Sequence, residues 1–348
     1  MSKRHSRTAP LPMNRHNVAP RIRKSKPITS LPCTTLKYTL IVIAFYCCVL
    51  FPFQSKQQSE ILVVSTETNV ATNNQFNAPV VNTNDITDKK RSHQCLNEDF
   101  KPTNKVSVWT MLNDNPSYVL SALKLGRALK KHTKSIDFDL VVMTLKSKPL
   151  SDESMKQLTE VGFTNCVVES IRPTHVEGKT RGDLTEKFGV LRVFSMTIYD
   201  TVLFLDADTF VNGPLDDLLK MDLQGKTIGV TKDIRNRKWV DTFNSGVMLL
   251  HPSEKDYNYL MKLLMDKTFE FEYVMSDQGF LNAVYKDNWH EIGFIYNANL
   301  ALYRFQRPFW DEHKLEDIRI IHYTMQKPWK CQANGPYGPI CKIWIDAE

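Results

Sequence analysis

The sequence of 348 residues lacks the ligand spacings of a structural zinc site, because it has no Cys-x-x-Cys pair and no histidine-rich pair. It also has no Asn-x-Ser/Thr glycosylation site after residue 53. Apolar residues make up 42% of the chain, which excludes a wholly disordered or collagen-like protein. The length allows one large domain or two ordinary ones, each with a proper core.

Acidic residues are absent from positions 1–37, where nine lysines and arginines lie. The whole chain has a net charge of +7, so the remainder carries −2. Positive charge is therefore a property of the N-terminal tail and not of the rest of the chain. The tail also lacks interleaved aromatic residues, so we expect no nucleic-acid partner.

Charge is also absent from residues 38–53, which read YTLIVIAFYCCVLFPF. Extended to 36–55 at the widest, this run is just long enough to cross a bilayer. A cleaved signal peptide is disfavoured by the long preceding segment and by the lack of a small-x-small cleavage site. A buried core helix is disfavoured by its basic and polar neighbours. We favour an uncleaved signal anchor, which makes 1–37 a cytoplasmic tail in a single-pass type II membrane protein.

Residues 54–104 are rich in Asn, Thr, Ser, Gln and Val and predict a flexible luminal stem. The folded domain is expected over 105–348. An even number of cysteines, which fits an oxidising lumen, lies beyond the anchor: Cys95, Cys166, Cys331 and Cys341. The last two bracket a Gly/Pro-rich loop that a disulfide could close, but the sequence leaves the pairing open.

Apolar patterns in the domain alternate between strand and helix. Strands are expected at 106–111, 138–144, 166–169 and 202–205, and helices at about 118–129, 152–161 and 185–198. This order predicts an α/β fold with an open, mostly parallel central sheet and helices on both faces. Ligands bind such sheets beyond the C-terminal strand ends.

The strand TVLFL ends in Asp206-Ala207-Asp208. Positions i and i+2 of an extended chain point to the same side, so both carboxylates can face one divalent cation, and Ala207 lets a ligand approach the backbone. An isolated triplet of this kind is more often a polar turn. Its place after a buried strand favours a ligand site.

Four segments in order carry a wider resemblance: LFLDADTFV (203–211), FNSGVMLLHPS (243–253), SDQGFLNAVY (276–285) and IIHYTMQKPW (320–329). They resemble glycosyltransferase family 8, the glycogenin-like group of retaining, metal-dependent sugar transferases. The resemblance covers about 105–330 and implies a single GT-A (Rossmann-like) domain that uses a UDP-sugar donor.

The resemblance implies that Asp206, Asp208 and His322 are metal ligands, with one of the two aspartates also reaching the ribose. Two carboxylates and an imidazole suit Mn²⁺, with Mg²⁺ as the alternative. Lys327 and Lys187 are similar to lysines that grip the donor diphosphate. The competing interpretations are a core or capping histidine and solvated surface lysines.

The same resemblance implies a role for the remaining predicted site residues. Leu112, Asn113 and Tyr118 would contact the uridine, although Tyr118 fits the apolar helix stripe equally well. Asn244, Ser245, Asp277 and Gln278 would face the donor sugar. Retention then proceeds by same-face attack within an ion pair or through a covalent intermediate, with Asp277 or Gln278 on the relevant face, and the sequence does not decide between the two routes.

These features predict a hexosyl- or N-acetylhexosaminyltransferase of the Golgi membrane that acts on a glycan or glycoprotein acceptor. Whether the protein forms a homodimer is left open by the sequence. The alternative is a catalytically silent carbohydrate- or partner-binding module. It is motivated by the loop after His322, where Thr324, Met325 and Gln326 stand in place of the family's common glycine. Tyr303 lies near the position of the self-glucosylated tyrosine of glycogenin, and we expect it to be a packing residue.

Overall fold

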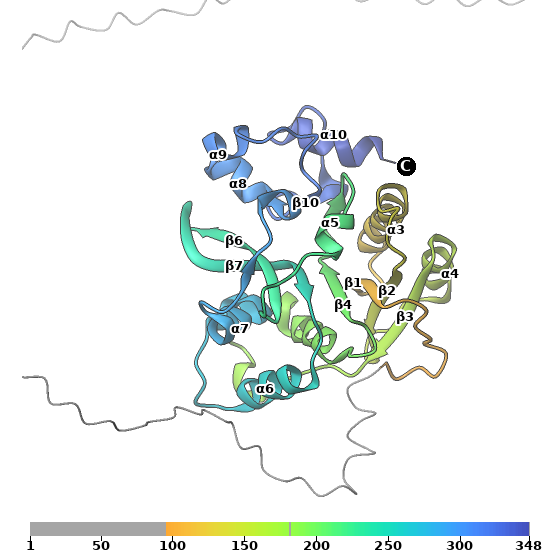
Figure 1. Cartoon of the computed structure of the whole chain (residues 1–348), viewed down its shortest axis with the longest axis vertical. Helices are drawn as coiled ribbons and strands as arrows, with labels where there is room; N and C mark the ends of the chain where they lie inside the picture. Colours follow the sequence, from red (N-terminus) through yellow and green to blue (C-terminus); the bar gives the residue numbers. More distant parts are fainter. Residues whose placement is uncertain (1–94, 181, 348) are drawn as a thin grey trace, which may run out of the picture. The chain divides into compact units, whose positions relative to one another are not determined.

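The computed structural model describes residues 95–180 and 182–347 (Figure 1). The predicted tail, the anchor at 38–53 and most of the predicted stem lie outside the described residues. Within the described ranges, no helix combines the length and apolar character that a membrane crossing needs.

The central sheet contains seven strands within the described residues, in the order β3-β2-β1-β4-β7-β6-β8. Four strands are parallel to one another: β1 (Val106–Leu112), β2 (Asp139–Leu145), β3 (Phe163–Val168) and β4 (Thr201–Leu205). The strands β6 (Ile228–Arg235) and β7 (Lys238–Leu250) form an antiparallel pair, and β7 is antiparallel to β4. A short β8 (His290–Glu291) is parallel to β6. The prediction of a mostly parallel sheet is confirmed.

Both faces of this sheet are buried, as β4 illustrates. Its residues Leu203 and Leu205 join one apolar core, which also contains residues of α3 (Pro116–His132) and α4 (Asp152–Val161). Val202 and Phe204 join a second core, which contains residues of α6 (Glu254–Met265) and α7 (Ser276–Tyr285). Figure 1 shows α3 and α4 on one side of the domain and α6 and α7 on another. This arrangement confirms the prediction of helices on both faces.

The first helix shows how local sequence fixes its ends. The Asn115 side chain accepts a hydrogen bond from the Ser117 backbone N–H, and Pro116 occupies the first turn, where no backbone donor is needed. Three basic residues, Lys130, Lys131 and His132, complement the carbonyl end of the helix. The helix therefore begins at the C-terminal end of β1.

The segment Gly182–Ser195 differs from the predicted α-helix at 185–198, because it is a 3₁₀ helix. A 3₁₀ helix has three residues per turn, so Phe188, Leu191 and Phe194 lie in one stripe. Val190 and Val193 lie outside that stripe and are equally buried, and all five side chains enter the second core.

A second, three-stranded sheet contains β5 (Thr209–Val211), β10 (Ile320–His322) and β9 (Ala298–Asn299), in the order β5-β10-β9. The β10 strand is antiparallel to β5, with His322 opposite Thr209. This register brings His322 beside the end of β4. The remaining α-helices of the described residues are α5 (Asp216–Leu219), α8 (Leu300–Phe305), α9 (Arg307–Asp311) and α10 (Gly338–Asp346).

Two disulfides join the four cysteines beyond the predicted anchor. Cys331 pairs with Cys341 and closes the Gly/Pro-rich loop, and Cys95 pairs with Cys166 on β3, which settles the pairing that the sequence left open. The segment before β1 is further held by hydrogen bonds from the Leu96 backbone N–H to the Val167 carbonyl and from the Asn97 side chain to the Asn165 carbonyl. Ordered contacts therefore begin before residue 105.

Candidate active site

A cavity of about 550 Å³ lies at the C-terminal ends of β1 and β4. Its lining includes Leu112, Asn113, Tyr118, Lys187, Asp206, Ala207, Asp208, Asn244, Gln278, His322 and Lys327. The structure thus gathers residues from six separate sequence segments at the edge of the sheet where an α/β fold binds ligands. Of the predicted site residues, Ser245 and Asp277 lie immediately behind this lining and are almost fully buried.

The Asp206 and Asp208 carboxylates and the His322 ring form a group whose ligand atoms all lie within 4.8 Å of one another. The Nε2 atom of His322 lies 3.4 Å from Oδ1 of Asp208 and 3.9 Å from Oδ2 of Asp206. Two carboxylates and an imidazole are a suitable donor set for a divalent cation. The predicted ligand set is therefore assembled in one place.

The orientation of His322 depends on residues that sequence reasoning missed. Its Nδ1 atom lies 3.1 Å from Oδ1 of Asn297, a fully buried side chain. A Cβ atom added to Gly246 on β7 would lie 2.1 Å from Cε1 of His322, so only glycine leaves room for this ring. The Gly246 carbonyl also accepts a hydrogen bond from the Asp206 backbone N–H. One glycine thus contacts both sides of the ligand group.

Two lysines neutralise the aspartates. Lys187 pairs with Asp206, and Lys327 pairs with Asp208. Burial would raise the pKa of the Asp208 carboxyl, but His322 and Lys327 outweigh burial and hold that pKa well below its usual range. Burial likewise opposes the charge on Lys187, but Asp206 and Asp277 raise its pKa above the ordinary value. Both lysines are therefore cationic at the cavity wall.

Tyr118 is placed both to contact a ligand and to pack against the protein, the two roles expected from the sequence. It lines the cavity, and its ring also packs edge-on against Trp329, with 4.5 Å between ring centroids. Burial raises the pKa of its hydroxyl. Because Trp329 follows closely after Lys327, this contact ties the helix α3 to the loop that carries the second lysine.

A hydrogen-bond network connects the residues predicted to face the sugar. Oε1 of Gln278 lies 3.3 Å from both the Asn244 side-chain nitrogen and the Ser245 backbone nitrogen. Nε2 of Gln278 donates to Asp233, a residue of β6 that the sequence did not single out. The Ser245 hydroxyl donates to Asp277 over 3.2 Å. Burial raises the pKa of Asp277 to about 6, opposed by the Lys187 cation.

A second cavity of about 250 Å³ lies next to Gln278. It is lined by Asp233, Arg235, Glu272, Met275 and Gln278, among other residues. Gln278 lines both cavities, so the larger and the smaller space adjoin at this residue.

Further lining residues of the larger cavity gave no sequence signal: Met111, Leu145, Lys148, Leu184 and Glu186. Thr324, from the loop that lacks the family's common glycine, also lines it. The Thr324 Oγ1 atom is buried and has no hydrogen-bond partner among the described residues. Tyr303 packs against Trp310 and Tyr337, at 5.2 and 5.8 Å between ring centroids, in agreement with the prediction of a packing role.

Comparison with known proteins identifies the family of this domain. The sequence model described as Glycosyl transferase family 8 matches residues 94–333. Glycogenin-1 of Mus musculus is 29% identical over 246 residues, 68% of each chain. Inositol phosphorylceramide glucuronosyltransferase 1 of Arabidopsis thaliana is 30% identical over 263 residues, which are 67% of this chain and 44% of that protein. A putative UDP-glucuronate:xylan alpha-glucuronosyltransferase 4 of the same plant is matched over 37% of its length.

Solved structures show the same fold. The glycosyltransferase GlyE of Streptococcus pneumoniae has a TM-score of 0.52 and 21% identity, covering 71% of this chain and 62% of that one. The galactosyltransferase LgtC, in complex with donor and acceptor sugar analogs, has a TM-score of 0.50 and 15% identity, covering 69% and 96%. The domain thus has a GT-A-like α/β fold. This chain belongs to glycosyl transferase family 8 and is a glycosyltransferase.

Proposed function

We propose that this protein transfers a hexosyl or N-acetylhexosaminyl group from a UDP-sugar to a glycan or glycoprotein acceptor, with retention and with Mn²⁺ as its cation. The observation that carries the proposal is the placement of Asp206, Asp208 and His322 with two lysines in one cavity of about 550 Å³. Carboxylates and an imidazole suit Mn²⁺, and the lysines suit a diphosphate.

The cation is expected to be held by Asp206, Asp208 and His322, where it would act as a Lewis acid toward the diphosphate oxygens. Lys187 and Lys327 supply positive charge where the leaving UDP accumulates negative charge as the sugar bond breaks. The hydroxyl of Thr324 is buried and unpartnered among the described residues, and rotation about χ1 would let it donate a hydrogen bond to the same diphosphate. That contact would take the place of the backbone contact expected at the family's common glycine.

Retention by same-face attack within an ion pair is the route that the side chains support. A nucleophile must approach the anomeric carbon to about 3–3.5 Å. Asp277 is 6% exposed, accepts a hydrogen bond from Ser245 and lies behind the cavity lining. Gln278 lines the cavity, but its amide oxygen already accepts from Asn244 and Ser245. We therefore assign these residues to orientation and charge stabilisation of the sugar.

The acceptor is proposed to approach through the second cavity. This cavity adjoins the larger one at Gln278, and Asp233 hydrogen-bonds to Gln278 from the same side. An acceptor hydroxyl on that side lies next to the donor sugar, as transfer requires.

We further propose a single-pass type II arrangement in the Golgi membrane, with 38–53 as the anchor and the catalytic domain in the lumen. Its support is the uncharged run, the nine preceding basic residues and two disulfides, which persist in an oxidising compartment. Protease treatment of sealed microsomes tests it: the domain should be protected and the tail digested. A homodimer stays a prediction that sedimentation of the purified protein would test.

The catalytic proposal is tested by release of UDP from a panel of UDP-sugars, using the full chain with Mn²⁺ and then with EDTA. One donor should give turnover that EDTA abolishes. Asp208→Asn should abolish it too, because the variant loses a buried anionic ligand. Asp287→Asn is the matched control, since Asp287 is exposed on the surface. Unchanged turnover in Asp208→Asn would overturn the site assignment.

A further inference from the structure

A basic and aromatic surface lies at the tip of the β6–β7 ribbon, where it meets the helix α8. We define this tip surface by Arg237, Lys238, Trp239, Arg304 and Phe305. Four of the five side chains are exposed, and Phe305 is half-buried beneath the arginines. Figure 1 shows the ribbon reaching the edge of the domain below α8 and α9.

Two guanidinium groups share one aromatic ring in this surface. The guanidinium carbons of Arg237 and Arg304 lie 5.2 and 5.3 Å from the ring centroid of Phe305. Within residues 95–180 and 182–347, no carboxylate forms an ion pair with Arg237, Lys238 or Arg304. Like charges so close repel each other, and an anionic group between them would relieve the repulsion.

Trp239 adds an apolar surface to the positive charge. Its side chain is 39% exposed, and its ring packs edge-on against Phe309 with 5.0 Å between centroids. An exposed indole held in this way offers a rigid face. The C–H groups on one side of a pyranose ring can cover such a face. Charge and an aromatic platform together are the chemistry that recognises an acidic sugar chain.

The surface is preorganised by backbone contacts. Nε2 of Gln306 donates a hydrogen bond to the Arg237 carbonyl over 2.6 Å. Asn236 and Arg237 have φ angles of 49° and 66°, the left-handed conformation of a tight hairpin turn. The side chain of Asn299 caps α8, which carries Arg304. Binding there would cost little ordering of the chain.

The tip surface continues into the catalytic region. Asp233, which hydrogen-bonds to Gln278, lies on the strand that leads to Arg237. Arg237 lies in the hairpin turn directly after this strand, since Arg235 already pairs with Lys238 of β7. Arg235 lies between them and, with Gln278, lines the second cavity. A chain that leaves the reacting hydroxyl through this cavity therefore reaches Arg235 and then the tip surface.

We propose that the tip surface binds the anionic part of the acceptor glycan, so that the acceptor is an acidic oligosaccharide. The inference rests on the proposed function, since it names the acceptor class of the same site. Continuity with the second cavity favours a glycan over an anionic bilayer, because a flat membrane at the tip would make no use of that cavity.

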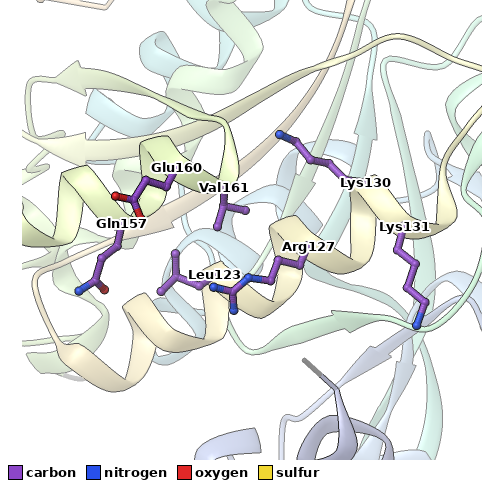
Figure 2. A pocket seen from close by; sticks show the side chains of 7 residues that line it. All are labelled: Leu123, Arg127, Lys130, Lys131, Gln157, Glu160 and Val161. Atoms are coloured by element: carbon purple, nitrogen blue, oxygen red, sulfur yellow. The ribbon is translucent and has the colours of Figure 1, made fainter.

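The other basic hollow of the domain is less suited to an anion. A cavity of about 560 Å³ between α3 and α4 is lined by Arg127, Lys130, Lys131 and Glu160, among others. Figure 2 shows the Lys130 and Lys131 side chains pointing in different directions, with Glu160 on the facing helix. In Figure 1 these helices lie at the side of the domain opposite the β6–β7 tip. Arg127 and Lys131 thus provide a matched control.

The test measures binding of a polygalacturonate oligosaccharide by the full chain in detergent, with neutral dextran of equal length as the reference. The double variant Arg237→Ser/Arg304→Ser should weaken polygalacturonate binding about tenfold or more, since charge-assisted hydrogen bonds are lost. The control Arg127→Ser/Lys131→Ser should bind within about twofold of the wild type. Added salt should weaken wild-type binding and have less effect on the tip variant.

Equal binding of polygalacturonate by the tip variant and the wild type would overturn the proposal. So would equal wild-type affinity for dextran, or a tip-dependent affinity confined to phosphatidylserine vesicles. UDP release without acceptor is recorded on the same samples and should be unchanged in both double variants. Failure of the wild type to release UDP from any donor would count against the proposed function, while the binding comparison still decides the role of the tip surface.

Discussion

The Nδ1 atom of His322 lies 3.1 Å from the side-chain oxygen of Asn297. Two further hydrogen bonds determine which atom of this contact is the donor. The Gly246 backbone N–H donates to Oδ1 of Asn244, which also accepts from Nδ2 of Asn297. The Asn297 oxygen is then the acceptor for a proton on Nδ1. With a cation bound, Nε2 would give up its proton and direct its lone pair toward the space beside Asp206 and Asp208, as a metal ligand requires.

Replacement of Asn297 should weaken cation binding without removing a ligand. Loss of a hydrogen-bond partner behind a metal-bound histidine typically costs 10–100-fold in affinity, and we expect about that loss for Asn297→Ala. Titration calorimetry with Mn²⁺ in the presence of UDP measures it. Asn258→Ala, at an exposed position of α6, is the control. Equal affinity in both variants would show that His322 is held by other contacts.

The hydroxyl of Thr324 should contribute to donor affinity. Thr324 lines the cavity, and its hydroxyl is buried without a hydrogen-bond partner among the described residues, so rotation about χ1 would let a diphosphate oxygen accept from it. A hydrogen bond to a charged group contributes about 1.5–3 kcal/mol, so Thr324→Val should weaken UDP binding about tenfold or more. Thr324→Ser keeps the hydroxyl and should bind UDP nearly as the wild type does. A Val variant with unchanged affinity would assign Thr324 a packing role only.

The aspartate pair and its strand could be predicted because their signal is local. The strand β4 is five buried residues, and the turn that follows it carries both carboxylates. The first two helices could be placed in the same way, since caps and a regular apolar stripe mark them. Such features depend on neighbours in sequence, so the sequence alone reveals them.

The support for His322 could not be predicted because it depends on contacts between distant segments. Asn297 precedes the strand Ala298–Asn299, which is too short to show any period. Asp233 meets Gln278 only through pairing of β6 and β7, a register that shifts at two places. Gly246 has its role because a ring from residue 322 lies over it. None of these relationships leaves a pattern along the chain.

Asp277 should make the ligand-free protein less stable as the pH rises from 4 to 6. Its pKa is about 6 in the folded protein against an ordinary value of 3.8, so the folded state binds more protons within this window. Unfolding free energy then falls with pH until Asp277 is ionised in both states, by up to about 3 kcal/mol. Urea denaturation at several pH values measures this. Below pH 4 the penalty is absent.

Asp277→Asn supplies the control for that measurement. Asparagine is neutral at every pH, so the variant should gain stability relative to the wild type between pH 4 and 6, with a constant difference above pH 7. A difference that does not change with pH would mean that Asp277 titrates normally. Measurements are made with EDTA, because a bound cation would itself alter the charge around the site.

The two disulfides should separate stability from donor binding. Cys331–Cys341 closes the loop that follows Lys327 and Trp329, whereas Cys95–Cys166 ties the N-terminal segment to β3, away from the cavity lining. By loop-closure entropy, removal of the disulfide should lower the free energy of unfolding by about 2.5 kcal/mol for the short loop and about 4 kcal/mol for the long one. The paired Cys→Ser variant that loses more stability should therefore be the one that loses less UDP affinity. Cys331→Ser/Cys341→Ser should lose less stability but bind UDP several-fold more weakly, because Lys327 is less well positioned. Cys95→Ser/Cys166→Ser should lose more stability and keep its UDP affinity. Urea denaturation and UDP titration on both variants measure the two effects, and equal UDP affinity would show that Lys327 is positioned without the Cys331–Cys341 bond.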